Sequence, residues 1–281
     1  MLRLASMVSI VAMLACIGAA PAPRRAQPPA RAVPKRIVSL NLCADQYLLA
    51  LADRGQIAAL TRLARDPAMS AAADAARRVP VTRGSAEEVL ALRPDLVIAA
   101  PGLRHETASA LQGRGIAQLA LPPADSYADI VAQTRSVAAA IGHPKRGEAL
   151  VRRMDAALAR VPHDAGRGHV AAEYQRRGFL TGTGTLVDEL MRRVGLTNLA
   201  ARLGKPVLAQ LSLEELAVAR PDWLIVDEGD ARVVDRGTEM LHHPIIGGVP
   251  RLRLRGAWTV CGGPAYVLAA ASLARQLRAG R

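Results

Sequence analysis

The chain has 281 residues, of which 51% are hydrophobic, and it carries a formal net charge of +13. This length and hydrophobic content exclude a disordered chain and allow one large domain or two modest ones. The charge suggests a nucleic-acid partner, but the arginines are spread along the chain and no basic helix with interleaved aromatic residues occurs, so no such partner is expected.

The first residues are typical of a secretory signal peptide. Arg3 precedes an apolar stretch, residues 4–20, that is rich in small side chains. Because this stretch is short and a polar segment follows at once, it indicates export rather than a membrane span. We assign residues 1–20 to the signal peptide and residues 21–35 to a linker rich in Pro and Arg. The sequence MLAC ending at Cys16 leaves open an alternative form that is lipid-anchored through Cys16.

Residues 36–125 alternate between strand and helix patterns. This alternation is typical of parallel strands with crossover helices, and it predicts an α/β lobe. Short apolar, partly β-branched runs predict strands over residues 36–40, 57–60, 95–100 and 116–121, and helical periodicity predicts helices over residues 44–52 and 106–112.

A long helical segment, residues 126–162, connects this lobe to the rest of the chain. Apolar side chains form a stripe along it and arginines lie opposite, as in an amphipathic helix. Gly142, His143 and Pro144 interrupt the pattern, so the segment is either two helices or one helix with a kink.

The alternation starts again in residues 163–281. We expect an α/β fold in which two α/β lobes with parallel sheets are joined by one long helix. In the second lobe the patterns predict strands over residues 169–174, 223–227 and 258–261, and helices over residues 186–194 and 265–277, the first of them ended by Gly195.

An internal repeat links the two lobes. Residues 85–98 read SAEEVLALRPDLVI and residues 212–225 read SLEELAVARPDWLI, with seven of 14 positions identical. Ser85 and Ser212 are expected to cap a short helix whose first turn carries two glutamates, and Arg-Pro-Asp is expected to end that helix before a buried strand.

Three stretches carry a family resemblance. They are the repeated motif, RIVSLNLCADQYLLALAD at residues 36–53 and GFLTGTGTLVDELMRRVGLTNLA at residues 178–200. Together they resemble the periplasmic substrate-binding proteins of ABC importers for iron-siderophore complexes, haem and cobalamin, of the type with a helical backbone. The resemblance covers nearly all of residues 36–281. It implies a monomer in the periplasm that captures a metal chelate between its lobes and delivers it to a permease dimer.

The resemblance also implies that one glutamate at the tip of each lobe docks onto arginines of the permease. By motif position these are Glu87 and Glu214, and exposed carboxylates at matched places suit a pseudo-symmetric dimeric partner. The alternative is that they only complement the positive end of the helix dipole. Glu88 and Glu215 are less favoured for docking.

Ligands of open α/β sheets bind beyond the carboxyl ends of the strands. We therefore expect the ligand to contact loop residues there, although Asn41 and Asp45 have the alternative role of capping a helix. Aromatic side chains suit a pocket, and arginines suit an anionic chelate. The candidates are Asn41, Cys43, Asp45, Arg62, Arg104, Tyr174, Arg176, Trp258 and Tyr266, and Asp227 and Glu228 also follow a strand.

No metal site and no cofactor are expected, because the six histidines show no convergent pattern and the metal is expected to arrive inside the chelate. The low aromatic content, 2%, departs from cobalamin receptors, which tend to line the cleft with several aromatic residues. The cysteines expected in the mature chain, Cys43 and Cys261, either form a disulfide or stay unpaired.

Two other functions compete with this interpretation. The first is an exported enzyme or a chelatase-like protein on the same two-lobe fold, but the sequence holds no G-x-S-x-G elbow, P-loop or HExxH motif, so we expect no enzyme. The second is a surface sensor that binds a ligand without a permease.

Overall fold

The computed structural model describes residues 32–102, 105–112, 114–230 and 235–280. The chain divides into two units, Met1–Ala32 and Val33–Arg281, and the fold below is that of the second. Within the described residues, no helix is long and apolar enough to cross a membrane. The segment predicted to be a signal peptide, with Cys16, lies outside the described residues.

The first lobe is built on a five-stranded parallel sheet with the order β3-β2-β1-β4-β5. Its central strand β1 is completely buried, as its β-branched sequence predicts. Because the strands are parallel, all of their carboxyl ends lie at one edge of the sheet. The strands are β1 (Ile37–Ser39), β2 (Ile57–Thr61), β3 (Val81–Thr82), β4 (Leu96–Ala99) and β5 (Ala117–Ala120), and the helices are α1 (Leu42–Leu51), α2 (Ala73–Ala76), α3 (Ala86–Ala91) and α4 (His105–Leu111).

Asp45 is a buried carboxyl that ties helix α1 to strand β2. It accepts hydrogen bonds from the backbone N–H of Thr61 at 3.2 Å and from the Thr61 hydroxyl at 2.5 Å. Burial raises the pKa of Asp45 from 3.8 to about 6, and hydrogen bonds from Ser39 and Thr61 oppose this rise only in part. The folded chain therefore holds this proton more tightly than the unfolded chain does.

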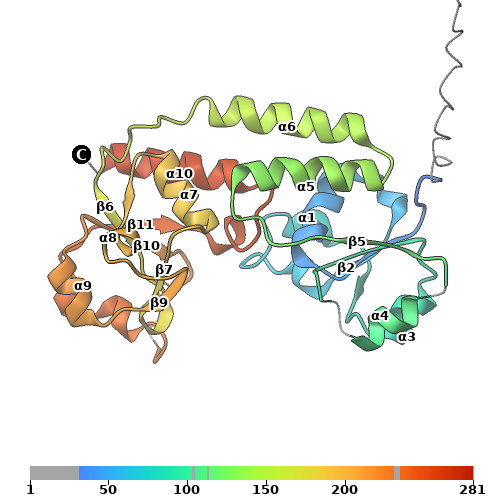
Figure 1. Cartoon of the computed structure of the whole chain (residues 1–281), viewed down its shortest axis with the longest axis horizontal. Helices are drawn as coiled ribbons and strands as arrows, with labels where there is room; N and C mark the ends of the chain where they lie inside the picture. The colour runs from blue at the N-terminus through green and yellow to red at the C-terminus, as the bar shows by residue number, and fades with distance from the viewer. Residues whose placement is uncertain (1–31, 103–104, 113, 231–234, 281) are drawn as a thin grey trace, which may run out of the picture. The chain divides into compact units, whose positions relative to one another are not determined.

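The connecting segment is two antiparallel helices, α5 (Tyr127–Ala140) and α6 (Pro144–Leu158) (Figure 1). The break falls where Pro144 takes the first helical position of α6, a place that needs no backbone N–H donor. Arg135 of α5 pairs with Glu148 of α6 at 2.7 Å. Of the two alternatives left open by the sequence, the structure has two helices, and α6 makes the connection to the second lobe.

The second lobe has a four-stranded parallel sheet with the order β11-β10-β6-β8, and a separate antiparallel pair, β7 and β9. Its strands are β6 (Val170–Glu173), β7 (Phe179–Thr181), β8 (Thr197–Asn198), β9 (Leu208–Gln210), β10 (Trp223–Asp227) and β11 (Arg251–Leu254), and its helices are α7 (Leu186–Arg193), α8 (Leu199–Arg202), α9 (Leu213–Ala219) and α10 (Tyr266–Ala279). Short 3₁₀ helices occur in both lobes at Arg54–Gln56, Arg62–Arg65, Arg176–Gly178, Glu239–His242, Pro244–Ile246 and Gly256–Trp258.

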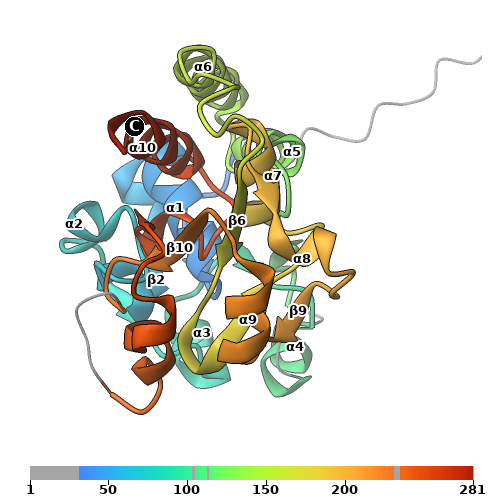
Figure 2. The same ribbon diagram turned by 90° about the vertical axis from the view of Figure 1, so that its left-hand side faces the viewer.

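The two faces of this sheet bury different apolar clusters. Ile225 of β10 packs in the large cluster formed with α6, α7 and α10, while its neighbours Leu224 and Val226 pack in the cluster on the opposite face. Figure 2 shows α6, α7 and α10 together on one side of β6 and β10, with α9 on the other. The alternation of side chains along a strand produces this separation.

The expectation of a strand over residues 258–261 is wrong. The last strand is β11, which pairs with β10, and Trp258 instead ends a 3₁₀ helix. The backbone N–H groups of Thr259 and Val260 both bond to the Gly256 carbonyl, which makes a turn and leaves no ladder to extend. The sequence also did not indicate β3, β8, β7 and β9, which have only two or three residues each, too few for a period-two pattern.

The two copies of the repeat begin in the same way. The Ser85 hydroxyl accepts a hydrogen bond from the backbone N–H of Glu88 at 3.3 Å, and the Ser212 hydroxyl accepts one from Glu215 at 3.1 Å. Both predicted helix caps are therefore confirmed.

The Arg-Pro-Asp part of the repeat ends each helix and then fixes a strand. The arginine of each copy has a left-handed backbone with φ of 46°, which turns the chain out of the helix. Asp95 accepts a hydrogen bond from the backbone N–H of Arg36 at 2.9 Å, and Asp222 accepts one from Val170 at 2.7 Å. Each aspartate thus holds the start of an inner strand of its own lobe, β1 in the first and β6 in the second.

The segment after β11 returns to the first lobe and is fastened there. Cys261 forms a disulfide with Cys43 at the start of α1, 218 residues away. The Tyr47 hydroxyl donates a hydrogen bond to the Gly262 carbonyl at 3.0 Å. Residue 262 has no room for a side chain, because a Cβ there would meet the Ala124 carbonyl. The sequence left the state of the two cysteines open, and the structure has them paired.

Replacing both cysteines by serine (Cys43→Ser with Cys261→Ser) should lower the free energy of unfolding by about 2–5 kcal/mol, since closing a long loop lowers the entropy of the unfolded chain. Urea denaturation followed by circular dichroism measures this change. A reductant should destabilise the wild type and leave the double variant unaffected. Equal stability of the oxidised wild type and the variant would contradict the prediction.

Asp45 should make stability fall as the pH rises. Its contribution is complete below pH 3.8, the value of the unfolded chain, and is lost as the pH passes through about 6. Between pH 3.5 and 7, the free energy of unfolding of the wild type minus that of Asp45→Asn should fall by up to roughly 3 kcal/mol. Denaturation at a series of pH values checks this. A flat difference curve for Asp45→Asn would show that burial does not raise this pKa.

Candidate functional site

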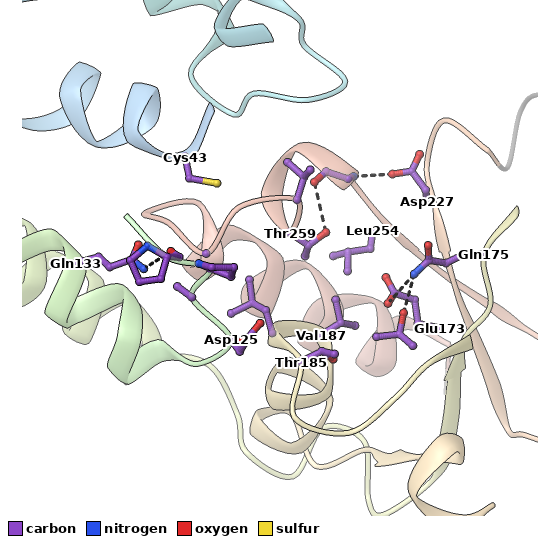
Figure 3. A pocket seen from close by; sticks show the side chains of 18 of the residues that line it. Cys43, Asp125, Gln133, Glu173, Gln175, Thr185, Val187, Asp227, Leu254 and Thr259 are labelled. Carbon is purple, nitrogen blue, oxygen red and sulfur yellow. Dashed lines mark hydrogen bonds between the residues drawn. The ribbon is translucent and has the colours of Figure 1, made fainter. Parts of the chain in front are cut away.

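A cavity of about 580 Å³ lies between the carboxyl edges of the two sheets (Figure 3). Helix α7 contributes its first turn to the wall. The lining residues are Asn41, Cys43, Ala100, Leu121, Pro122, Pro123, Ala124, Asp125 and Gln133 from the first lobe and helix α5, and Glu173, Gln175, Thr181, Thr185, Leu186, Val187, Asp227, Asp230, Leu254, Gly256, Thr259, Val260 and Gly262 from the rest of the chain.

The cavity is acidic although the chain is strongly basic. Its lining holds the carboxyl groups of Asp125, Glu173, Asp227 and Asp230. Amide and hydroxyl side chains supply most of the remaining polar surface. Within the described part of the chain, no lysine, arginine, histidine or aromatic residue lines it. The cavity therefore favours a neutral or cationic surface on whatever it binds.

Glu173 stands at the carboxyl end of β6 and forms a polar cluster with two neighbours. The Gln175 amide donates to the Thr181 hydroxyl at 2.6 Å and to the Glu173 carboxylate at 3.5 Å (Figure 3). Burial raises the pKa of Glu173, and the Asp227 carboxylate adds to the rise, while hydrogen bonds from Thr181 and Gln175 oppose it. The carboxyl group is thus poised to accept a hydrogen bond from a ligand or, when protonated, to donate one.

Asp227 at the end of β10 is fixed by backbone donors. Its carboxylate accepts hydrogen bonds from the N–H of Gly229 at 2.7 Å and of Gly256 at 2.6 Å. A Cβ on residue 256 would lie 2.6 Å from the Asp227 carboxylate, so glycine is required for this approach. The turn after β11 therefore holds the carboxylate against the cavity.

Of the nine predicted ligand-binding residues, two line the cavity. Asn41 also caps helix α1, where its side chain accepts hydrogen bonds from the N–H of Cys43 at 2.7 Å and of Ala44 at 3.1 Å. Cys43 presents a disulfide sulfur rather than a thiol. Both stay candidates for contact with a ligand.

The prediction that Asp45, Tyr174 and Tyr266 contact the ligand is corrected, because the structure buries all three completely in the core. The Tyr174 hydroxyl donates to the Leu211 carbonyl at 2.8 Å, and the Tyr266 hydroxyl donates to the Glu189 carboxylate. Tyr174 follows Glu173 directly, so at the end of β6 the two side chains point to opposite faces. The glutamate faces the cavity and the tyrosine faces the core.

Three further candidates lie outside the lining of this cavity. The half-buried Trp258 ring has the Arg255 guanidinium 5.4 Å from its centroid. Arg176 forms ion pairs with Asp230 at 3.2 Å and with Asp235 at 2.9 Å. Arg62 lines a second hollow on the first lobe. The ninth candidate, Arg104, lies outside the described residues.

Sequence reasoning missed Asp125, Gln133, Glu173, Gln175 and Asp230, all of which line the cavity. For two of them a signal was present. Residues 173 and 175 flank Tyr174, so the strand alternation that buries a tyrosine turns both neighbours toward the opposite side. The position of Gln133 depends on how α5 packs, which no local pattern specifies.

Glu87 and Glu214 are exposed in the first turns of α3 and α9. The second glutamate of each copy is engaged locally. Glu88 accepts hydrogen bonds from the Thr82 hydroxyl and from a backbone N–H, both at 2.7 Å. Glu215 accepts one from the Ser212 N–H at 3.0 Å and pairs with a lysine. Glu87 and Glu214 therefore have the exposure that docking requires, whereas Glu88 and Glu215 stabilise the local structure.

Among the described residues, no group of three or more His, Cys, Asp or Glu side chains is arranged to hold a metal ion. The carboxylates around the cavity are thus spread along its wall rather than gathered at one point.

Comparisons with known proteins place the chain in a family. A family model described as periplasmic binding protein matches residues 37–250. The periplasmic haem-binding protein RhuT of Roseiflexus sp. RS-1 is 25% identical, with a TM-score of 0.70 over 87% of this chain and 98% of that one. A periplasmic haem-binding protein of Pseudomonas aeruginosa, 20% identical, shares the fold with a TM-score of 0.67 over 88% and 93% of the two chains.

A cobalamin-binding protein of Halobacterium salinarum is 26% identical over 202 residues, which are 68% of this chain and 53% of that protein. The chain thus spans about half the length of the curated relatives it matches. The family and these relatives are binding proteins rather than enzymes, in agreement with the expectation from the sequence. Since the family model covers most of the two-lobe unit, the chain belongs to the periplasmic binding protein family.

Proposed function

We propose that the chain is the solute-binding component of an ABC importer and that it captures a metal-chelate nutrient in the cavity between its lobes. Membership of the family supports a binding role, and similar proteins bind haem and cobalamin. The cavity lies where the carboxyl ends of both sheets meet, which is the usual ligand site of open α/β sheets.

Among the metal chelates, the lining favours a corrinoid such as cobalamin. The observation that carries this choice is the combination of carboxylates with amide and hydroxyl groups and no cationic side chain among the described lining residues. A corrinoid presents many carboxamide N–H donors, and Glu173, Asp227 and Gln175 are acceptors for such donors. Its cobalt is held by the macrocycle and therefore needs no protein ligand.

Haem and ferric siderophores fit this lining less well. Haem iron is held by His, Cys thiolate, Met or Tyr side chains, and none of these lines the cavity within the described residues, since the Cys43 sulfur is bonded in a disulfide. Haem propionates and anionic catecholates or hydroxamates require cations, and the described lining residues provide carboxyl groups instead. The low aromatic content limits stacking on a macrocycle, so hydrogen bonds carry most of the recognition.

We further propose that residues 1–20 direct the chain to the periplasm and are removed, or that Cys16 carries a lipid anchor in an alternative form. The mature protein acts as a monomer. It presents Glu87 and Glu214, one on each lobe, to the arginines of a permease dimer. Helices α3 and α9, which carry these residues, lie on the side of the two lobes away from α6 (Figure 1).

The purified protein should bind cyanocobalamin at sub-micromolar concentration and should bind haem and ferric hydroxamate or catecholate chelates far more weakly. Isothermal titration calorimetry against each compound tests this ranking. Ala100→Trp places a bulky ring in the lining and should weaken cobalamin binding by roughly a hundredfold or more, because ring and ligand compete for the same volume.

The matched control is Leu268→Trp, which adds the same ring at an exposed site on α10 and should bind as the wild type does. Tight binding of haem with none of cobalamin would overturn the corrinoid proposal. No binding of any chelate would overturn the receptor proposal as well.

Glu87→Arg and Glu214→Arg should each reduce uptake by about tenfold or more while leaving ligand affinity unchanged, because like charges then face each other at the docking surface. Uptake of labelled ligand in cells that depend on this chain measures the first effect, and calorimetry measures the second. Asp74→Arg, a charge reversal on α2 of the first lobe, is the control and should transport normally. Normal uptake by both glutamate variants would show that docking does not depend on Glu87 and Glu214, and uptake that does not depend on the wild-type chain at all would favour a sensor without a permease.

A further inference from the structure

A second hollow, of about 550 Å³, lies on the first lobe beside the main cavity. It follows the carboxyl ends of β1 to β4, whereas the main cavity lies nearer to β5. Ala100 lines both, so the two hollows adjoin. Its lining includes Leu40, Arg62, Arg83 and Ala100, which directly follow β1, β2, β3 and β4.

The charge of this hollow is opposite to that of the main cavity. Arg62 and Arg83 line it, and no carboxylate stands among its described lining residues. Leu40 and Leu63 provide apolar surface beside the arginines, and Leu63 is 47% exposed. An anion bound here would be paired with guanidinium groups next to an apolar wall, where charge-assisted hydrogen bonds are strengthened.

Neither guanidinium forms an ion pair within the described residues. Arg176, by contrast, is neutralised by two aspartates beside the main cavity. Glu88 attracts Arg83, but its carboxylate already accepts hydrogen bonds from the Thr82 hydroxyl and the Arg83 backbone N–H. Arg62 and Arg83 therefore keep their donors available at the edge of the sheet where ligands of this fold bind.

The strand order places positive and negative side chains at opposite ends of one sheet edge. In the order β3-β2-β1-β4-β5, Arg83 and Arg62 follow the strands at one end and Asp125 follows the strand at the other. A ligand that spans both hollows would meet acceptors and carboxylates at its body and guanidinium groups at its periphery.

We propose that Arg62 and Arg83 form a subsite for an anionic arm of the ligand, a phosphodiester in the case of cobalamin, whose neutral or cationic body occupies the main cavity. This inference rests on the proposed function, because it assigns a second part to the same ligand. It makes the two arginines specificity residues that distinguish complete corrinoids from those without the phosphodiester.

The test measures the affinity of the wild type and of the double variant (Arg62→Gln with Arg83→Gln) for two corrinoids. These are cyanocobalamin and dicyanocobinamide, which lacks the nucleotide and its phosphodiester. Cobalamin affinity should fall roughly tenfold or more, since a charged hydrogen-bond pair is lost, and cobinamide affinity should not change. Arg78→Gln, at an exposed arginine of the same lobe outside both hollows, is the matched control and should bind both as the wild type does. Equal denaturation midpoints confirm that the variants fold.

A second measurement does not depend on corrinoids. Dimethyl phosphate is titrated into the wild-type protein while the Nε–H signals of Arg62 and Arg83, assigned from the variants, are followed by NMR. Saturable shifts of these signals support the subsite, even if neither corrinoid binds, in which case only the corrinoid proposal fails. The subsite is overturned if the double variant weakens both corrinoids equally or neither, and also if no corrinoid binds and no arginine signal moves.

Discussion

The geometry of the ligand site depends on the fastening of the segment after β11 to the first lobe. Helix α6 connects the lobes once, and this segment returns through the Cys43–Cys261 disulfide and the hydrogen bond from Tyr47 to Gly262. Both ties lie at or beside the cavity wall, and the return places Thr259, Val260 and Gly262 in its lining. Because a helix and a covalent bond resist bending more than loop hinges do, we expect the cavity to be largely preformed and to close little around a ligand.

This basic chain has an acidic cavity and, beside it on the first lobe, a hollow lined by arginines. The net charge is +13, yet the cavity gathers carboxylates because Asp227 is held by backbone N–H groups and Asp230 is paired with Arg176. Arginine beside the cavity is thus neutralised by aspartate, while Arg62 and Arg83 on the first lobe keep their charge available. The net charge of the chain therefore does not predict the charge of the cavity, since local ion pairs and hydrogen bonds decide which charged side chains line it.

The repeat shows how one short motif serves structure and, as proposed, function. Its serine caps a helix, its second glutamate bonds within its own lobe, and its aspartate holds the start of an inner strand. These contacts fix the helix that carries the first glutamate, Glu87 or Glu214, on an exposed turn. Because the same contacts occur in both lobes, the two carboxylates are presented in the same local way.

The sequence by itself determined the alternation of strands and helices, an interruption at residues 142–144 that was either a break or a kink, the caps at Ser85 and Ser212 and the family, because these depend on local periodicity, capping and motifs. It also pointed to the sheet edge at which the cavity lies, through the rule on parallel strands. Only the tertiary structure decided which side chains face the cavity. Tyr174 and Tyr266 turn into the core while Glu173 turns outward, and Cys43 meets a cysteine 218 residues away. Such choices depend on the face of a strand and on contacts between distant segments, which no local pattern encodes.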